Sequence, residues 1–190
     1  MRPDLVLGCG DLPFDYLEYL VSRLDVPLLY VPGNHDPSLK PPDTTWMPLS
    51  SDVPAPGPAG CESVDGRVVE TLGLRIAGLG GSLRYKPGPN QYTQGQAGRR
   101  AMWLEVAIRL KRVRQGRKLD VLVTHAPPSG LEEADDPAHA GLVAALRLIQ
   151  HFQPLIAVHG HVHPFGRVVP ERRVGSTRVI NVVPSRVIEI

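Results

Sequence analysis

The chain has only two cysteines, Cys9 and Cys61, among its 190 residues. Two cysteines are too few for the disulfide framework of a small secreted domain, and Cys9, inside an apolar run, is expected to pack as a small buried hydrophobe. No stretch approaches the roughly 18 to 20 consecutive apolar residues of a transmembrane helix. The first residues also lack a basic segment followed by an apolar core, so the sequence predicts a cytoplasmic protein without a membrane partner.

Charge of one sign is not concentrated in any part of the chain. Twenty-one Lys and Arg residues are balanced by 19 Asp and Glu residues, which leaves a net charge of +2. Without a dense basic block, extended binding to nucleic acid is not indicated. No internal repeat or linker is visible, and the length suits one domain, so residues 1–190 are predicted to form a single domain.

Four short polar segments, three of them bearing glycine, follow apolar runs. They are Gly-Asp at 10–11, Gly-Asn-His-Asp at 33–36, Thr-His at 124–125 and Gly-His-Val-His at 160–163. The runs before them are rich in Leu and β-branched residues, which is typical of buried strands. The polar residues therefore fall at the carboxyl ends of strands, where open α/β sheets form their ligand crevices. Asp, Asn and His in this mixture predict a site for a divalent metal.

Each segment taken alone also has a plain structural interpretation. Gly-Asp is a common turn dipeptide, and the segment at 33–36 is consistent with an Asn/Asp-rich turn. His125 is equally compatible with an inert, hydrogen-bonded residue at a strand end. His161 and His163 are more specific, because side chains two residues apart on extended backbone share a face. The joint occurrence at four strand ends is what favours the metal site.

The remaining periodicity predicts three helices and several further strands. Leu and Tyr at helical spacing indicate the first helix, and Gly116 is a natural end for the second. A tight hairpin at Gly73 joins two short strands. The predicted helices span 13–24, 93–116 and 139–151, and the predicted strands span 4–9, 27–32, 67–72, 74–80, 119–124, 155–159, 166–170, 176–183 and 186–190.

The order GD, GNHD, a single His after a strand, then GHxH resembles the calcineurin-like metallophosphoesterase family over essentially the whole chain. The flanking DLVLGCGDL, VPGNHD, VTHAPP and VHGHVHP are also similar to that family. The resemblance implies an α/β fold, a layered sandwich of two mixed β-sheets flanked by helices. It also implies a metal-dependent hydrolase of a small phosphomonoester or phosphodiester.

The resemblance assigns metal ligands residue by residue. The Asp of GD bridges two metals in that family, which gives Asp11 the bridging role. Asn34, His125 and His161 match the remaining ligands of the second metal, and His163 matches a ligand of the first. The metal type is left open among manganese (Mn²⁺), Fe and Zn²⁺.

The resemblance also assigns catalytic and substrate-facing residues. His35 matches the histidine that assists the leaving oxygen, and Asp36 is its expected orienting carboxylate. A long loop at 81–92 carries Arg84, which is suited to clamp a phosphate oxygen. A surface loop with packing tyrosines is the alternative interpretation of this segment.

One departure from the family is large. Its Asp-x-His pair, at the end of a first strand, does not precede Gly10-Asp11, and the first metal would have only Asp11 and His163. One metal site is therefore expected and the second is in question. The alternative to a hydrolase is a weak or inactive metal- or phosphate-binding module. The free edge of strand 4–9 is expected to be covered by a partner copy in a homo-oligomer or by a terminal strand of the chain.

Overall fold

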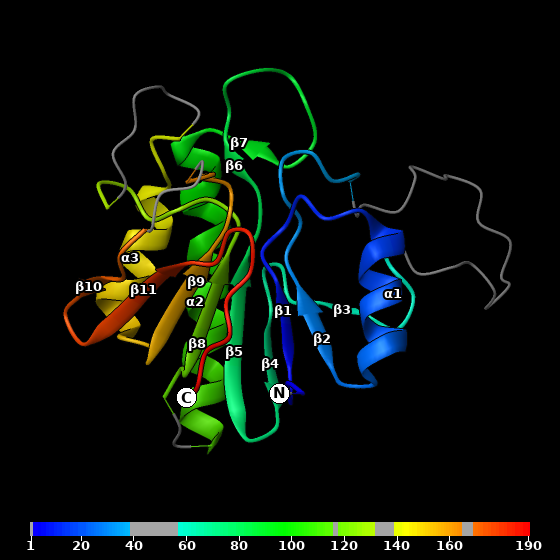
Figure 1. Ribbon diagram of the computed structural model, residues 1–190. Helices are drawn as coiled ribbons and strands as arrows, with labels where there is room; N and C mark the ends of the chain where they lie inside the picture. Colours follow the sequence, from blue (N-terminus) through cyan, green and yellow to red (C-terminus); the bar gives the residue numbers. More distant parts are fainter. Residues whose placement is uncertain (1, 39–56, 116–117, 132–138, 165–168) are drawn as a thin grey trace, which may run out of the picture.

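The computed structural model describes residues 2–38, 57–115, 118–131, 139–164 and 169–190. Two β-sheets lie face to face, with helix α1 on the outer side of the smaller sheet and helices α2 and α3 on the outer side of the larger (Figure 1). The described helices are α1 (Phe14–Leu24), α2 (Gln94–Gln115) and α3 (Val143–Phe152). None of them is both long enough and apolar enough to span a bilayer.

The smaller sheet is parallel in its described strands and has the order β1-β2-β3. The larger sheet is mixed and has the order β10-β11-β9-β8-β5-β4, while β6 and β7 form a separate parallel pair. The strands are β1 (Val6–Gly8), β2 (Leu28–Tyr30), β3 (Glu62–Ser63), β4 (Val68–Thr71), β5 (Leu74–Leu79), β6 (Ser82–Leu83), β7 (Gln91–Tyr92), β8 (Val121–Thr124), β9 (Ile156–His159), β10 (Arg172–Val174) and β11 (Thr177–Asn181).

Alternation along the central strands divides the core into layers. On β8, Val121 and Val123 belong to the cluster between the two sheets, whereas Leu122 packs in the cluster beneath α2 and α3. Successive side chains of a strand point to opposite faces, so a strand covered on both faces must be apolar at every position. This explains the unbroken apolar runs in the sequence. On the other side, Leu17 of α1 packs with Leu28 and Tyr30 of the smaller sheet.

Local signals fix the start of α2 and the β4–β5 hairpin. Thr93 and Gln96 form a reciprocal capping box, in which each side-chain oxygen accepts a hydrogen bond from the other residue's backbone N–H (3.2 and 2.9 Å). In the hairpin, Leu72 and Gly73 both have positive φ, as a tight turn between antiparallel strands requires. The predicted hairpin at Gly73 is confirmed.

Two predicted elements differ from the structure, and a third lies mostly outside the described residues. The alternating segment 186–190 is not a strand, because among the described residues no neighbouring strand supplies its backbone hydrogen bonds. The helix predicted from residue 139 begins at Val143, since the preceding residues pair Leu142 with Pro128. The predicted strand 166–170 lies mostly outside the described residues, and the strand that precedes β11 is the polar β10.

Strand β1 lies at an edge of the smaller sheet. Within the described part of the chain no strand pairs with its free side, and Val182 and Ile188 of the C-terminal segment pack against the inter-sheet cluster, as Leu5 and Leu7 do. The C-terminal segment therefore adds apolar side chains to the inter-sheet cluster and does not form the expected terminal strand. The homo-oligomer stays a prediction.

Candidate metal centre

Four strand ends bring the predicted polar residues to one place. Asp11 follows β1 and Asn34 follows β2, while His125 directly follows β8 and His161 comes just after β9. Because these strands are parallel within their sheets, their carboxyl ends lie on one side of the molecule.

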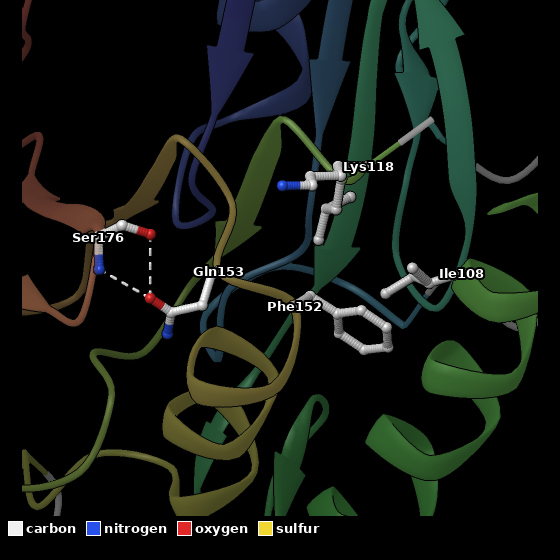
Figure 2. A pocket seen from close by; sticks show the side chains of 6 residues that line it. Ile108, Lys118, Phe152, Gln153 and Ser176 are labelled. Atoms are coloured by element: carbon white, nitrogen blue, oxygen red, sulfur yellow. Dashed lines mark hydrogen bonds between the residues drawn. The ribbon is translucent and has the colours of Figure 1, made fainter. Parts of the chain in front are cut away.

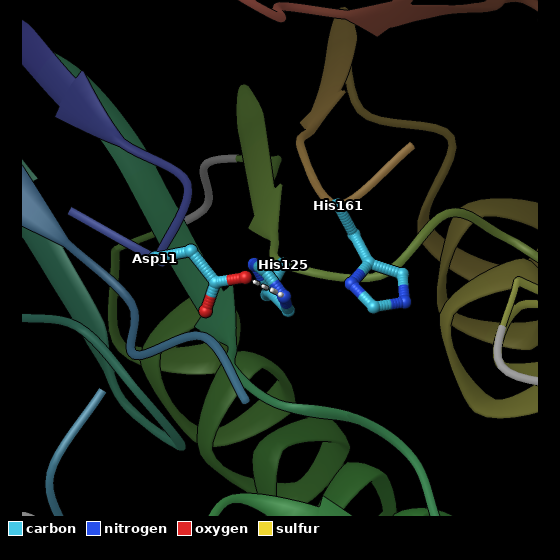
Figure 3. A group of neighbouring side chains, drawn as sticks. All are labelled: Asp11, His125 and His161. Atoms are coloured by element: carbon cyan, nitrogen blue, oxygen red, sulfur yellow. Dashed lines mark ion pairs between the residues drawn. The ribbon is translucent and has the colours of Figure 1, made fainter. Parts of the chain in front are cut away.

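Figure 3 shows the carboxylate of Asp11 directed at the ring of His125, with His161 beside them. The ligand atoms of these three residues all lie within 4.8 Å of one another. The amide oxygen of Asn34, Oδ1, is 2.9 Å from Nε2 of His125. Four of the five predicted metal ligands are thus gathered, whereas His163 is exposed and lies outside the acid–imidazole group.

Glycine allows the two N-terminal turns to approach so closely. A Cβ atom at Gly33 would overlap the carboxylate of Asp11, and one at Gly10 would overlap the backbone of Gly33. Gly10 also has φ +86°, and Asp11 itself is in the left-handed region with φ +56°. Such strained backbone persists only where its surroundings hold it in place.

Hydrogen bonds between the turns supply that support. The backbone N–H of His35 donates to Oδ1 of Asp11 (2.8 Å). One oxygen of Asp36 accepts from the N–H groups of Asp11 (2.9 Å) and Gly33 (2.7 Å). Burial raises the pKa of the Asp36 carboxyl, and those two N–H donors oppose the shift. Asp36 therefore ties the two turns together, while its role in orienting the exposed His35 side chain stays a prediction.

The chemistry of His125 fits a cation. Its Nδ1 lies 2.7 Å from the carbonyl oxygen of Cys9, and a carbonyl only accepts, so Nδ1 carries the proton. Burial lowers the pKa of His125 from 6.5 to about 4, although the nearby Asp11 opposes the shift, so the ring is neutral near pH 7. Its Nε2 then carries a lone pair and no proton. This nitrogen faces Oδ1 of Asn34 and lies 3.5 Å from Oδ2 of Asp11.

Three electron-rich atoms consequently converge with no proton between them. Such an arrangement repels itself unless a positive ion lies among the atoms. Neutral imidazole, carboxylate and amide oxygen are a typical donor set for a transition metal. Asp11, Asn34, His125 and His161 thus fit a divalent metal ion.

Cys9 behaves as the sequence suggested. Its side chain is buried, and burial raises the pKa of the thiol to about 12, so it is uncharged at neutral pH. Its contribution to the site is the backbone carbonyl that orients His125.

The loop between β6 and β7, considered from the sequence for substrate recognition through Arg84, contacts the site through Tyr85 and Asn90. The hydroxyl of Tyr85 is 3.2 Å from Nδ2 of Asn34, and Asn90 donates to two carbonyls of the Asn34 turn. The guanidinium of Arg84, by contrast, donates to the carbonyl of Gln91 and to the side chain of Gln96. Its proposed contact with phosphate stays a prediction.

His139 is a second residue that the sequence did not connect with the site. Its ring centre lies 5.1 Å from that of His161, and its side chain is half-buried. The loop brings it there because Leu142 pairs with Pro128, just beyond His125. No spacing pattern in the sequence predicts that the chain near His139 folds back to the segment after His125.

A cavity of about 120 Å³ lies at the opposite ends of the strands, and Figure 2 shows the side chains that line it. Its lining comes from Ile108 of α2 and from segments just before β8, β9 and β11, whereas the metal ligands follow the strands. It is therefore separate from the metal centre. The lining residues are Ile108, Lys118, Leu119, Phe152, Gln153 and Ser176.

The fold is similar to two solved crystal structures. With TT1561 of Thermus thermophilus the TM-score is 0.56 at 18% sequence identity, over 94% of this chain and 76% of that chain. With a second structure it is 0.53 at 21% identity, over 89% of this chain and 62% of the other. This chain therefore spans less than two thirds of the length of the second structure. At these identities the likeness shows the fold alone.

The sequence itself gives the family. Among curated proteins, no sequence matches this chain at a significant level. Residues 1–165, however, match the calcineurin-like phosphoesterase family, and these residues contain all four polar segments and the assembled metal ligands. The chain belongs to the calcineurin-like phosphoesterase family.

Proposed function

We propose that this protein is a metal-dependent phosphoesterase that hydrolyses a small phosphomonoester or phosphodiester. The observation that supports it most directly is the convergence of Asp11, Asn34, His125 and His161 within a chain of this family. Mixed oxygen and nitrogen ligands suit Mn²⁺, Fe or Zn²⁺. When bound, such a metal supplies Lewis acidity to a phosphoryl oxygen and to the attacking water.

The chain's own residues contribute position and proton transfer. Asp11 would hold the ion while its Oδ1 also accepts the backbone N–H of His35, so the position of His35 is tied to the ion. The imidazole of His35 is exposed beside the ligand group and is free to approach a substrate. We assign it the donation of a proton to the leaving oxygen. Binding of a substrate phosphate oxygen by Arg84 is part of the same proposal.

A metal-binding module without turnover is the second candidate. It is favoured by the position of His163, which is exposed and outside the acid–imidazole group, so the described residues offer one well-formed ion site. The two-metal mechanism of many phosphoesterases requires both sites to be filled.

Hydrolysis assays separate the two candidates. Protein supplied with Mn²⁺ should hydrolyse an aryl phosphodiester or monoester, and His35→Ala should keep its metal while losing about 10²-fold in rate. His151→Ala is a matched control, because His151 is an exposed histidine at the end of α3, near Glu105. Equal rates in wild type and His35→Ala would remove His35 from the mechanism. A wild type that binds metal without any turnover would favour the module.

A further inference from the structure

The β6–β7 loop is fixed to the turn that carries Asn34. Nδ2 of Asn90 donates to the carbonyl oxygens of Gly33 and Asp36, at 3.0 Å each. Just before β6, the N–H of Gly81 donates to the carbonyl of Pro32 (2.8 Å). In Figure 1 the loop lies at the top of the molecule, beside the turn that follows β2. Gly81 and Asn90 therefore hold the backbone of the turn that carries Asn34, one from each end of the segment 81–90.

The internal bonds of the loop fix the backbone at Tyr85. The buried side chain of Gln91 accepts hydrogen bonds through Oε1 from the N–H groups of Tyr85 (3.4 Å) and Lys86 (3.3 Å). The Arg84 guanidinium also donates to the Gln91 carbonyl (3.2 Å). Tyr85 is thus held on a braced loop, with its ring partly exposed and its hydroxyl at Asn34.

The side-chain amide of Asn34 faces the ion site with its oxygen and Tyr85 with its nitrogen. Its Oδ1 lies among the ligand atoms, 2.9 Å from Nε2 of His125, while its Nδ2 lies 3.2 Å from the hydroxyl of Tyr85. Asn34 is 3% exposed, so water has little access to the amide. A buried N–H group without an acceptor is costly, and in the described structure the Tyr85 hydroxyl is the acceptor within reach.

We propose that Tyr85 is a positioning residue of the metal centre, which acts by accepting a hydrogen bond from Nδ2 of Asn34 and so keeps Oδ1 directed at the ion. The inference rests on the metal centre of the proposed function. A bound cation draws electron density through Oδ1 and makes the N–H group a stronger donor. The hydrogen bond to Tyr85 is therefore stronger with the ion than without it, and that difference raises metal affinity.

The test measures metal affinity without substrate. Metal-loaded wild type and Tyr85→Phe are titrated with a Zn²⁺ chelator of known affinity. Loss of an outer partner of a ligand should weaken metal binding about tenfold or more. Tyr92→Phe is the matched control, because it removes a hydroxyl from β7, next to the same loop, and the Tyr92 ring packs under the guanidinium of Arg100 instead of at the metal site. It should leave the affinity unchanged.

A double-mutant cycle shows whether Tyr85 acts through Asn34. In an Asn34→Ala background the amide is gone, so Tyr85→Phe should no longer change metal affinity. If Tyr85→Phe binds zinc as tightly as wild type, the inference is overturned while the metal centre stands. If its effect is the same with and without Asn34, Tyr85 does not act by this route and the inference is again overturned. A wild type that takes up no zinc contradicts the metal centre itself, and the role of Tyr85 falls with it.

Discussion

Three of the four gathered ligands of the candidate metal centre are held by a partner on a different segment. His125 is oriented by the carbonyl of Cys9, the Asp11 backbone by Asp36, and Asn34 by Tyr85. Partners of this kind fix the tautomer and direction of a ligand before an ion arrives. At the scale of single residues, the centre is therefore organised in advance.

Gly33 is the residue whose size the site tolerates least. A Cβ atom there would overlap the carboxylate and backbone N of Asp11, both of which are fixed by hydrogen bonds. We expect Gly33→Ala to lower metal affinity about tenfold or more and to destabilise the fold by about 1–3 kcal/mol through overpacking. Chelator titration and urea unfolding measure the two effects.

Gly98→Ala is the control for that substitution. Gly98 lies in α2, and a Cβ atom there meets nothing within 4 Å, so this change should keep metal affinity and slightly stabilise the helix. Unchanged metal affinity in Gly33→Ala would show that the close approach of the two turns is not needed.

At the scale of elements, the sequence predicted the strand ends well and the loop contacts poorly. Asp11, Asn34, His125 and His161 were found because each comes within a few residues of the end of a buried apolar strand, and parallel strands place such positions together. The contacts of Tyr85 and His139 with the metal ligands were not predicted, because they depend on how loops return to the site. That return is set by long-range bonds such as Asn90 to Gly33, which leave no periodicity in the sequence.

The same reason explains the differences in secondary structure. Segment 186–190 alternates like a strand, yet a strand forms only where a neighbour pairs with it. The polar β10 has little strand pattern of its own, and it forms by pairing with β11 through a short turn. In both segments, whether a strand forms depends on a neighbouring strand, which is a property of the tertiary structure.

Strand β9 makes the fold sensitive to acid. His159 on this strand is 1% exposed, and burial lowers its pKa from 6.5 to about 4. Because the folded-state pKa lies below the unfolded one, the unfolded chain binds more protons between these values. Stability is then full above pH 6.5 and is lost as the pH falls towards 4, by up to roughly 3 kcal/mol for this residue.

Urea unfolding of metal-free protein from pH 7 to pH 4 checks this expectation. His159→Gln should flatten the decline, because glutamine does not titrate, whereas His151→Gln on the surface should leave it unchanged. A decline equally steep in wild type and His159→Gln would show that other groups cause the acid sensitivity.

At the scale of the whole molecule, the metal centre joins the two sheets. Asp11 and Asn34 come from the smaller sheet, and His125 and His161 come from the larger. Between the two sheets lies the apolar cluster that includes Cys9, Val31, Val123 and Val158. The packing of one sheet on the other thus sets the distance between the two halves of the centre. Such packing is consistent with the predicted single domain, 1–190, which stays a prediction.

A crystal structure of the protein with Zn²⁺, measured at the zinc absorption edge, tests the central claim most directly. The account predicts an anomalous peak bonded at about 2.0–2.2 Å to oxygens of Asp11 and Asn34 and to ring nitrogens of His125 and His161. Loss of that peak in His125→Ala, with the fold intact, would agree with it. A fully folded wild type that shows no peak among these four residues, or binds zinc only elsewhere, would contradict the account.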